Sequence, residues 1–341
     1  MSFYSTRNPL QFRARYGQPP NNVPDSTLVK NWSFELVNTN DLFVNNCSIH
    51  IGENAGANNQ STGAVAIGCH AAEQNQNLYS VAVGHYAGYQ NQNKYSLAFG
   101  SFAGYNNQGE STIALGSSAG YQNQKIRAIA IGLYAGFNNQ GDSAIAFGTS
   151  AGNLVQGTGS IAIGSNAGNT SQGFKAITIG YNSGYLSQGR NSIAIGEESG
   201  YSMQGIHSIA IGSSSGRSAQ GLNSIAIGNS AANQNQGVRA IAIGYNAATS
   251  GQQDDSIALG TRAGKYASTN TIVIGKDTGS TSLSVLPSGC TVIGTGFDST
   301  SVYGANPNSF FVKPIRVVSS LTGLRGLYYD SNSGEIVAYQ P

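Results

Sequence analysis

SIAIGSNAGNTSQGFK, residues 160–175, is one copy of a sixteen-residue unit that fills most of this chain. The glycine at its fifth position, Gly164, recurs at intervals of sixteen residues from Gly52 to Gly260. We take this glycine as the anchor and count positions from it. A fixed internal period is the signature of a repeat architecture. The repeat therefore organises the chain, although 341 residues would be enough for two or three separate domains.

The positions of the unit have a strict character. Position −3 is Ile, Val or Leu in every copy, and position −1 is Ile, Val, Leu or Phe. Alanine lies between them, except at His50 and Thr178. Position +3 is Ala or Ser, position +4 is Gly or Ala, and position +8 is Gln from Gln60 to Gln252. Such restriction indicates that each position has one environment in every copy.

The pattern Ile-Ala-Ile predicts a β-strand. It alternates with period two, and β-branched residues favour the pleated conformation. A helix would carry glycine in nearly every turn, at a cost of about 1 kcal/mol each. The anchor glycine ends the strand and permits a turn, and a second short strand is expected in the segment that ends at the glutamine. The sequence thus predicts an all-β solenoid of sixteen-residue coils, stacked about 4.8 Å apart.

Alternation along the strand places the two aliphatic residues on one face and the small Ser and Ala residues on the other. With the small residues inside, the coil is thin, and the aliphatic residues form an apolar stripe that other copies of the chain must bury. The alternative is a monomeric β-helix with the aliphatic residues inside. Ala and Gly on the facing strands favour the thin coil, because a wide interior would contain voids. The expected interface residues are Ile161, Ile163, Ile193, Ile195, Ile209, Ile211, Ile225 and Ile227.

Two other rows of side chains recur along the stack. Glutamine amides at position +8 are expected to hydrogen-bond up and down the stack as a ladder, the alternative being a row of ligand-binding amides. Aromatic residues recur at position +5, where they form either a stabilising ladder or a platform for glycan rings. The ladder residues are Gln60, Gln124, Gln172, Gln188, Gln204 and Gln220. The candidate glycan-binding residues are Tyr89, Tyr105, Tyr121 and Phe137, and Tyr185 and Tyr201 follow later at the same position.

Three copies carry a family resemblance: SIAIGEESG (192–200), SIAIGSSSG (208–216) and SIAIGNSAA (224–232). They resemble the head repeats of trimeric autotransporter adhesins of the YadA type. The resemblance covers residues 47–279 and implies a left-handed parallel β-roll. It also implies a homotrimer in which three rolls pack around one axis through their aliphatic faces.

The two ends do not repeat. Residues 1–46 are expected to be a docking or cap segment, and residues 280–341 a β-rich C-terminal cap. The segment 308–341, which contains FFVKPIR, LYYD and GEI, resembles the stretch that precedes a self-cleaving intramolecular chaperone in viral tail fibres. The start, MSFYSTRNPL, lacks the apolar core of a secretion signal, so synthesis in the cytosol is expected.

Composition and motifs argue against catalysis. Charged residues make up 9% of the chain, against about 25% in typical soluble proteins, and the net charge is +2. Nucleic acid is therefore not an expected partner, and no apolar stretch is long enough for membrane insertion. The three cysteines form no CxxC pair, Cys69 and His70 have no matching acid, and Asp254 and Asp255 fall in a turn. We expect no enzyme activity, no cofactor and no metal.

The expected function is that of a rigid trimeric fibre or spike on a virion surface, acting in attachment. Its expected partners are other virion or surface proteins, through residues 1–46, and a host glycan or receptor. The alternative is a microbial adhesin on the cell surface with the same β-roll. A solenoid enzyme fits less well, because short uniform turns leave no cleft, and ice binding would require regular outward rows of Thr.

Overall fold

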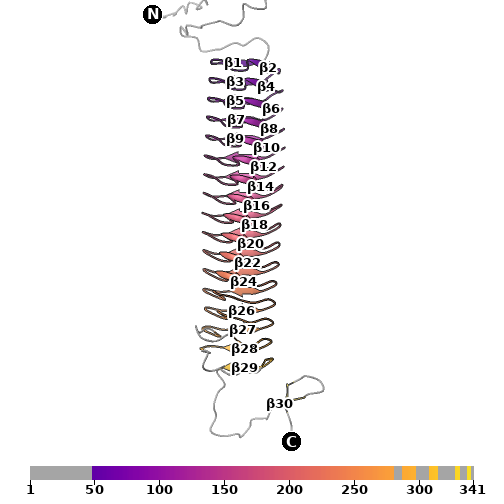
Figure 1. Cartoon of the computed structure of the whole chain (residues 1–341), viewed down its shortest axis with the longest axis vertical. Helices are drawn as coiled ribbons and strands as arrows, with labels where there is room; N and C mark the ends of the chain where they lie inside the picture. Colours follow the sequence, from indigo (N-terminus) through magenta and orange to yellow (C-terminus); the bar gives the residue numbers. More distant parts are fainter. Residues whose placement is uncertain (1–47, 280–285, 297–306, 314–326, 331–335, 339–341) are drawn as a thin grey trace, which may run out of the picture.

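The structure, a computed structural model, describes residues 48–279, 286–296, 307–313, 327–330 and 336–338. These residues are strands and turns without a helix, and most of them form one long rod of stacked coils (Figure 1). The predicted all-β parallel solenoid is confirmed. The expected docking segment, residues 1–46, lies outside the described residues, and the expected cap, residues 280–341, is described in part.

Each regular coil contributes one strand to each of two parallel sheets. We call the 17-stranded sheet A and the 12-stranded sheet B. Sheet A contains β1 (Ile49–Ile51), β3 (Val65–Ile67), β5 (Val81–Val83), β7 (Leu97–Phe99), β9 (Ile113–Leu115), β11 (Ile129–Ile131), β13 (Ile145–Phe147), β15 (Ile161–Ile163), β17 (Ile177–Ile179), β19 (Ile193–Ile195), β21 (Ile209–Ile211), β23 (Ile225–Ile227), β25 (Ile241–Ile243), β26 (Ile257–Leu259), β27 (Ile272–Ile274), β28 (Thr291–Gly294) and β29 (Phe310–Lys313). Sheet B contains β2 (Asn58–Gln60), β4 (Gln74–Gln76), β6 (Gln90–Gln92), β8 (Asn106–Gln108), β10 (Gln122–Gln124), β12 (Asn138–Gln140), β14 (Leu154–Gln156), β16 (Thr170–Gln172), β18 (Leu186–Gln188), β20 (Ser202–Gln204), β22 (Ser218–Gln220) and β24 (Gln234–Gln236).

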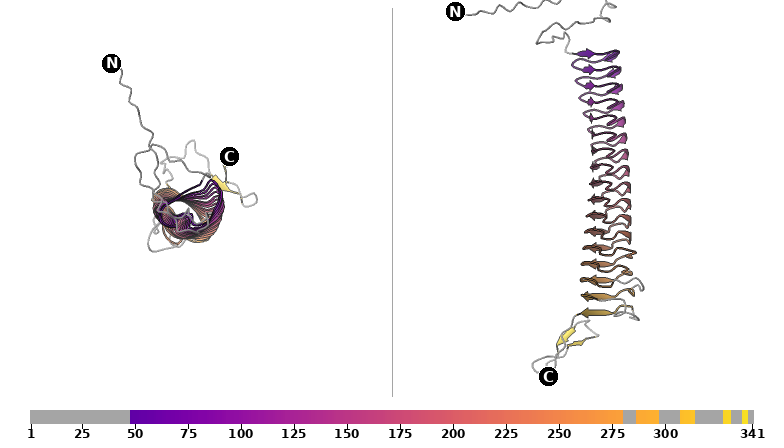
Figure 2. Two further views of the ribbon diagram at one scale, coloured as in Figure 1. Left: turned by 90° about the horizontal axis from the view of Figure 1, so that it is seen from above. Right: turned by 90° about the vertical axis from the view of Figure 1, so that its left-hand side faces the viewer.

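Neighbouring strands pair so that equivalent positions lie directly above one another. Ile145 pairs with Ile161 and Ala146 with Ala162, an offset of one repeat. The same register holds along the regular coils, and the view along the axis shows them stacked with a gradual rotation from one end to the other (Figure 2). Every repeated position in the sequence therefore becomes a continuous row on the molecule.

The two sheets end at different places. Sheet B stops at β24, below which a single bridge joins Gln234 to Ser250. Sheet A continues through β28 and β29, although the coils there no longer have sixteen residues. It therefore extends past residue 279, where we expected the β-roll to end. The reason is that Thr291–Gly294 and Phe310–Lys313 are rich in β-branched and aromatic residues, which favour strands, and they pair in register with the strand above. A separate antiparallel pair, β30 (Leu327–Tyr329) and β31 (Ile336–Ala338), follows.

Small side chains fill the interior of the coils. Ser160, Ala162 and Ala167, at positions −4, −2 and +3, are completely buried. The aliphatic residues on either side of Ala162 lie on the outer surface of sheet A, where Ile161 is half-buried and Ile163 is 37% exposed. The prediction that the small residues point inward is correct, and the alternative with the aliphatic residues inside a single coil is wrong.

The anchor glycine is required by two constraints. Gly164 has φ of +121°, a conformation that is essentially restricted to glycine. A Cβ at this position would also lie 2.7 Å from the carbonyl oxygen of Gly180, the anchor of the next coil. Backbone conformation and close coil stacking therefore each exclude a side chain.

Substituting an anchor glycine tests this explanation. We expect Gly164→Ala to lower the free energy of unfolding by about 3 kcal/mol, because it combines backbone strain with a clash against backbone. Gly200→Ala is the matched control, because Ala72, Ala232 and Ala248 occupy the same position in other coils with φ of 45–47°. Denaturant unfolding followed by circular dichroism gives both values. Equal losses in the two variants would contradict the explanation.

Candidate interaction surfaces

The glutamine at position +8 connects the two sheets across each coil. The Nε2 of Gln172, for example, donates to the carbonyl oxygen of Ile161 in the same coil at 2.7 Å. The equivalent bond is present for every glutamine of the row from Gln60 to Gln252, at 2.7–3.4 Å. This role was not predicted, because the repeat period identifies the residue that lies above another in the stack but not the residue that lies across the coil.

Glutamine bonds along the stack are less regular. Of the predicted ladder residues, Gln60 donates to Gln76 at 2.7 Å, and Gln188 donates to Gln204 at 3.1 Å. Gln124 accepts a bond from Gln108 at 3.3 Å. The Oε1 atoms of Gln172 and Gln220 have no hydrogen-bond partner. Both side chains are only 3% exposed, so these amides have no access to a ligand in solvent.

The outward residues at positions −3 and −1 of sheet A form what we call the aliphatic face. The predicted interface residues all lie on it, and each is half-buried or exposed in the single chain. Larger side chains extend this face toward the N-terminal coils, where Phe99 is 49% and Phe147 is 52% exposed. Because identical positions are stacked, the aliphatic face is continuous along the rod. A soluble monomer rarely exposes a continuous apolar strip of this kind.

The aromatic residues at position +5 stack on one another. Tyr89 and Tyr105 have ring centroids 5.0 Å apart, and the Tyr105–Tyr121 and Tyr121–Phe137 pairs are both 4.8 Å apart with nearly parallel planes. Tyr185 and Tyr201 form a second stack. Each inner ring is therefore covered on both faces by its neighbours. The row presents ring edges and hydroxyl groups to solvent, rather than open ring faces.

Local charge and burial favour the protonated form of two of these hydroxyls, those of Tyr89 and Tyr121. The negative charge of Glu73, together with burial, raises the pKa of Tyr89. Burial raises the pKa of Tyr121, and the neighbouring Tyr105 adds to the effect. Since a phenol ordinarily ionises near pH 10, both groups are hydrogen-bond donors at neutral pH.

A second aromatic row, at position +2, was missed from the sequence. His70 stacks on Tyr86 at 4.6 Å, and Tyr86 stacks on Phe102 at 5.4 Å. The row meets the first one edge-on, as in the contact of Tyr86 with Tyr89 at 5.2 Å. The sequence contained the signal, because these residues also repeat with a period of sixteen, but their proximity to position +5 depends on the turn between them.

A ladder of asparagines runs along the outer surface of sheet B at position +7. The Nδ2 of each residue donates to the Oδ1 of the next at 2.9–3.1 Å. These residues have φ of 55–60°, in the left-handed region that asparagine tolerates better than most residues. The ladder consists of Asn59, Asn75, Asn91, Asn107, Asn123 and Asn139.

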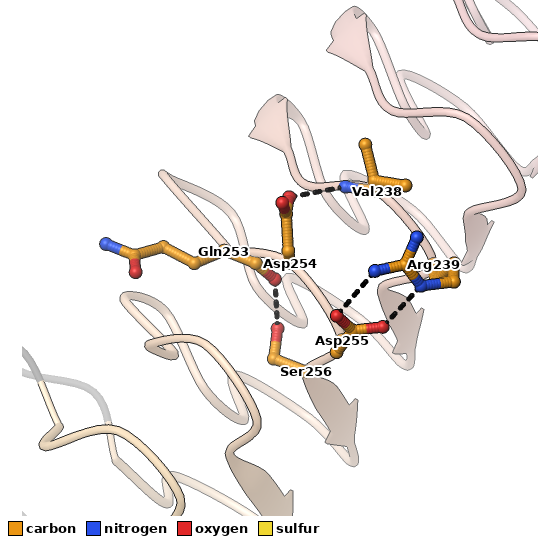
Figure 3. Close-up of polar contacts among 6 residues, drawn as sticks. All are labelled: Val238, Arg239, Gln253, Asp254, Asp255 and Ser256. Carbon is orange, nitrogen blue, oxygen red and sulfur yellow. Dashed lines mark hydrogen bonds and ion pairs between the residues drawn. The ribbon is translucent and has the colours of Figure 1, made fainter.

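The acidic turn at residues 253–256 is engaged in structural contacts (Figure 3). Asp254 Oδ1 accepts a bond from the backbone nitrogen of Val238 at 2.8 Å. Asp255 is paired with the guanidinium of Arg239 through bonds of 2.5 and 2.7 Å, and this pairing lowers the pKa of Asp255. A hollow of about 470 Å³ lies beside this turn, lined by Asn235, Gln253 and Asp254 among others. The two carboxylates thus face different partners.

The expectation that no acid matches Cys69 and His70 was wrong, because Glu53 and Glu73 lie beside them. His70 contacts Glu73 at 2.5 Å, and the thiol of Cys69 lies 3.9 Å from the Glu53 carboxylate. Within the described ranges, no group of three His, Cys, Asp or Glu side chains could hold a metal ion. In the same part of the chain, no helix could span a membrane.

Comparison with known families supports the fold assignment. A family model for the YadA head domain repeat matches two segments, residues 204–231 and 236–263. These two segments are similar to YadA head domain repeats. No curated protein and no solved structure matches the chain. The resemblance to YadA-type heads is thus confirmed, and of the two expected functions the match favours a surface adhesin over a viral fibre.

The buried glutamines at position +8 give a second test. The Gln92 side chain donates to the carbonyl oxygens of Val81 at 2.8 Å and Ser96 at 3.4 Å, and it accepts from Gln76 at 3.1 Å. Gln92→Met therefore removes three hydrogen bonds while keeping the volume. We expect a loss of about 1–3 kcal/mol in the free energy of unfolding. The exposed Gln234→Met should change it by less than about 0.5 kcal/mol.

A third variant tests whether the loss of stability follows the number of hydrogen bonds removed. Gln156→Met also removes a cross-coil bond, but Gln156 Oε1 has no partner to lose. The loss in the free energy of unfolding caused by Gln156→Met should fall between the losses caused by Gln92→Met and Gln234→Met. Denaturant titrations measure all three, and a loss for Gln92→Met no larger than that of the exposed control would refute the role of the cross-coil bond.

Proposed function

We propose that this protein is a rigid homotrimeric fibre displayed on a microbial surface, where it acts as an adhesin and has no catalytic role. The observation that supports this proposal is the continuous aliphatic face along a rod of YadA head repeats. Adhesins of this type use such repeats for display, and the uniform turns of this chain provide length and rigidity.

The geometry of the coil fits a three-fold assembly. The two sheets form different sides of each coil, so contact through the aliphatic face leaves the outer surface of sheet B available to other molecules. Three copies around one axis would remove residues such as Ile163 and Ile211 from water. Burial of apolar area contributes about 25 cal/mol per Å², and the contribution accumulates over every coil.

A fibre on a virus particle is the second candidate. It is favoured by the C-terminal sequence 308–341, which resembles the segment that precedes a chaperone in viral fibres. Strand β29, which extends sheet A, lies in that segment. Residues 1–46 would then attach the fibre to the particle. Mass spectrometry of purified cell envelopes and of purified virions distinguishes the two candidates by where the chain is found.

The oligomeric state is the decisive measurement. We expect light scattering to give a mass near three times that of the 35.2 kDa chain. The triple variant Ile193→Asp, Ile209→Asp and Ile225→Asp should abolish the trimer, because it places charges within a buried apolar seam.

Met203→Asp provides the control for that experiment. Met203 is 60% exposed and lies on the outer surface of sheet B, so this variant should remain trimeric. A wild-type mass near that of one chain would remove the proposed trimer.

A further inference from the structure

Three aromatic residues occupy a strained backbone conformation. Tyr86, Phe102 and Tyr134, at position +2, have φ of 53°, 57° and 55°. The left-handed region costs a bulky L-residue about 1 kcal/mol or more. Equivalent positions in later coils hold other residues in the same conformation, namely Asn166, Asn182, Glu198, Ser214, Ser230, Asn246 and Arg262. The backbone therefore does not require aromatic residues here, and asparagine, which tolerates this conformation better, is the usual alternative.

The neighbouring asparagine ladder supplies fixed hydrogen-bonding groups. An asparagine amide has two N–H donors and two acceptor lone pairs, and each inner rung uses one of each on its neighbours. The other donor and acceptor remain for solvent or a ligand. Asn75 and Asn107 are exposed. Because the rungs recur about every 4.8 Å, these groups form a regular, preorganised array along the rod.

This part of sheet B carries no charged side chain on its outer strand positions. Positions +5 to +7 read YQN at 89–91, YNN at 105–107, YQN at 121–123 and FNN at 137–139. At the same positions near the C-terminal end, Arg217 introduces a charge and Met203 an exposed apolar group. Tyrosine hydroxyls and amide groups are matched by a ligand that is rich in hydroxyl groups and has no net charge.

We propose that the face formed by positions +2, +5, +6 and +7 between residues 86 and 139 binds a neutral polysaccharide. The chain of the ligand would lie along the rod and meet the same groups at each coil. The inference rests on the proposed adhesive function and specifies the class of receptor. The face includes strands β6, β8, β10 and β12, in the N-terminal half of the rod (Figure 1). In a trimer, three such faces would add avidity.

Affinity electrophoresis of the full-length protein tests this proposal. Gels would contain one neutral polysaccharide each, such as hydroxyethyl cellulose, galactomannan, xylan, mannan or amylose, with alginate and heparin as anionic polymers. We expect retardation by at least one neutral polysaccharide. The double variant Tyr86→Asn and Phe102→Asn should weaken that binding at least tenfold. Its thermal midpoint should stay equal or rise, since asparagine suits the left-handed conformation.

The second aromatic stack supplies a matched control. Tyr185→Ser with Tyr201→Ser removes stacked rings from coils that lack the asparagine ladder, and it should change the affinity by less than twofold. Unchanged binding by the Tyr86→Asn and Phe102→Asn variant, retardation by the anionic polymers only, or no retardation at all would overturn the inference. Light scattering on the same samples tests the proposed fibre independently of polysaccharide binding. A trimer that binds no polysaccharide contradicts only the binding proposal, whereas a monomeric wild-type protein contradicts the proposed fibre.

Discussion

Hydrogen bonds between the backbones of consecutive coils set the spacing on which every other feature depends. Ile161 donates to Ala176, and Gly164 donates to Phe147, so each coil is joined to the one above and the one below. At this spacing the anchor glycines lie too close for any side chain. The period of sixteen residues is therefore a consequence of coil geometry, and all the rows of side chains follow from it.

The second constraint is the narrow interior. Alanine and serine allow the sheets to approach, but the backbone carbonyls at the start of each sheet A strand then need a donor inside the coil. Glutamine provides it, because its side chain is long enough to cross from sheet B. A buried polar group without a partner is costly. The constant spacing of Gln and Ile from coil to coil therefore has an energetic reason as well as a steric one.

Period and alternation were enough to predict the strands, the parallel stacking and the inward alanines. They could not show what crosses the coil, so the principal partner of Gln172 was missed. They also could not show that Tyr86 lies against Tyr89, since that contact depends on a turn with left-handed residues. The continuation of sheet A into β29 was not predicted because the coils there have lost the sixteen-residue period, and only the β-branched and aromatic character of the strand remains.

The dependence of each coil on its immediate neighbours has a consequence for how such a gene can change. Duplication or loss of one whole unit through unequal recombination would leave the cross-section intact and alter the reach of the rod by about 4.8 Å. Insertion or loss of a single residue would instead have to be absorbed in a turn, as between β26 and β27, where the offset is fifteen residues and sheet B has already ended. Length is thus the property that selection can adjust most easily in this molecule, in steps of one coil.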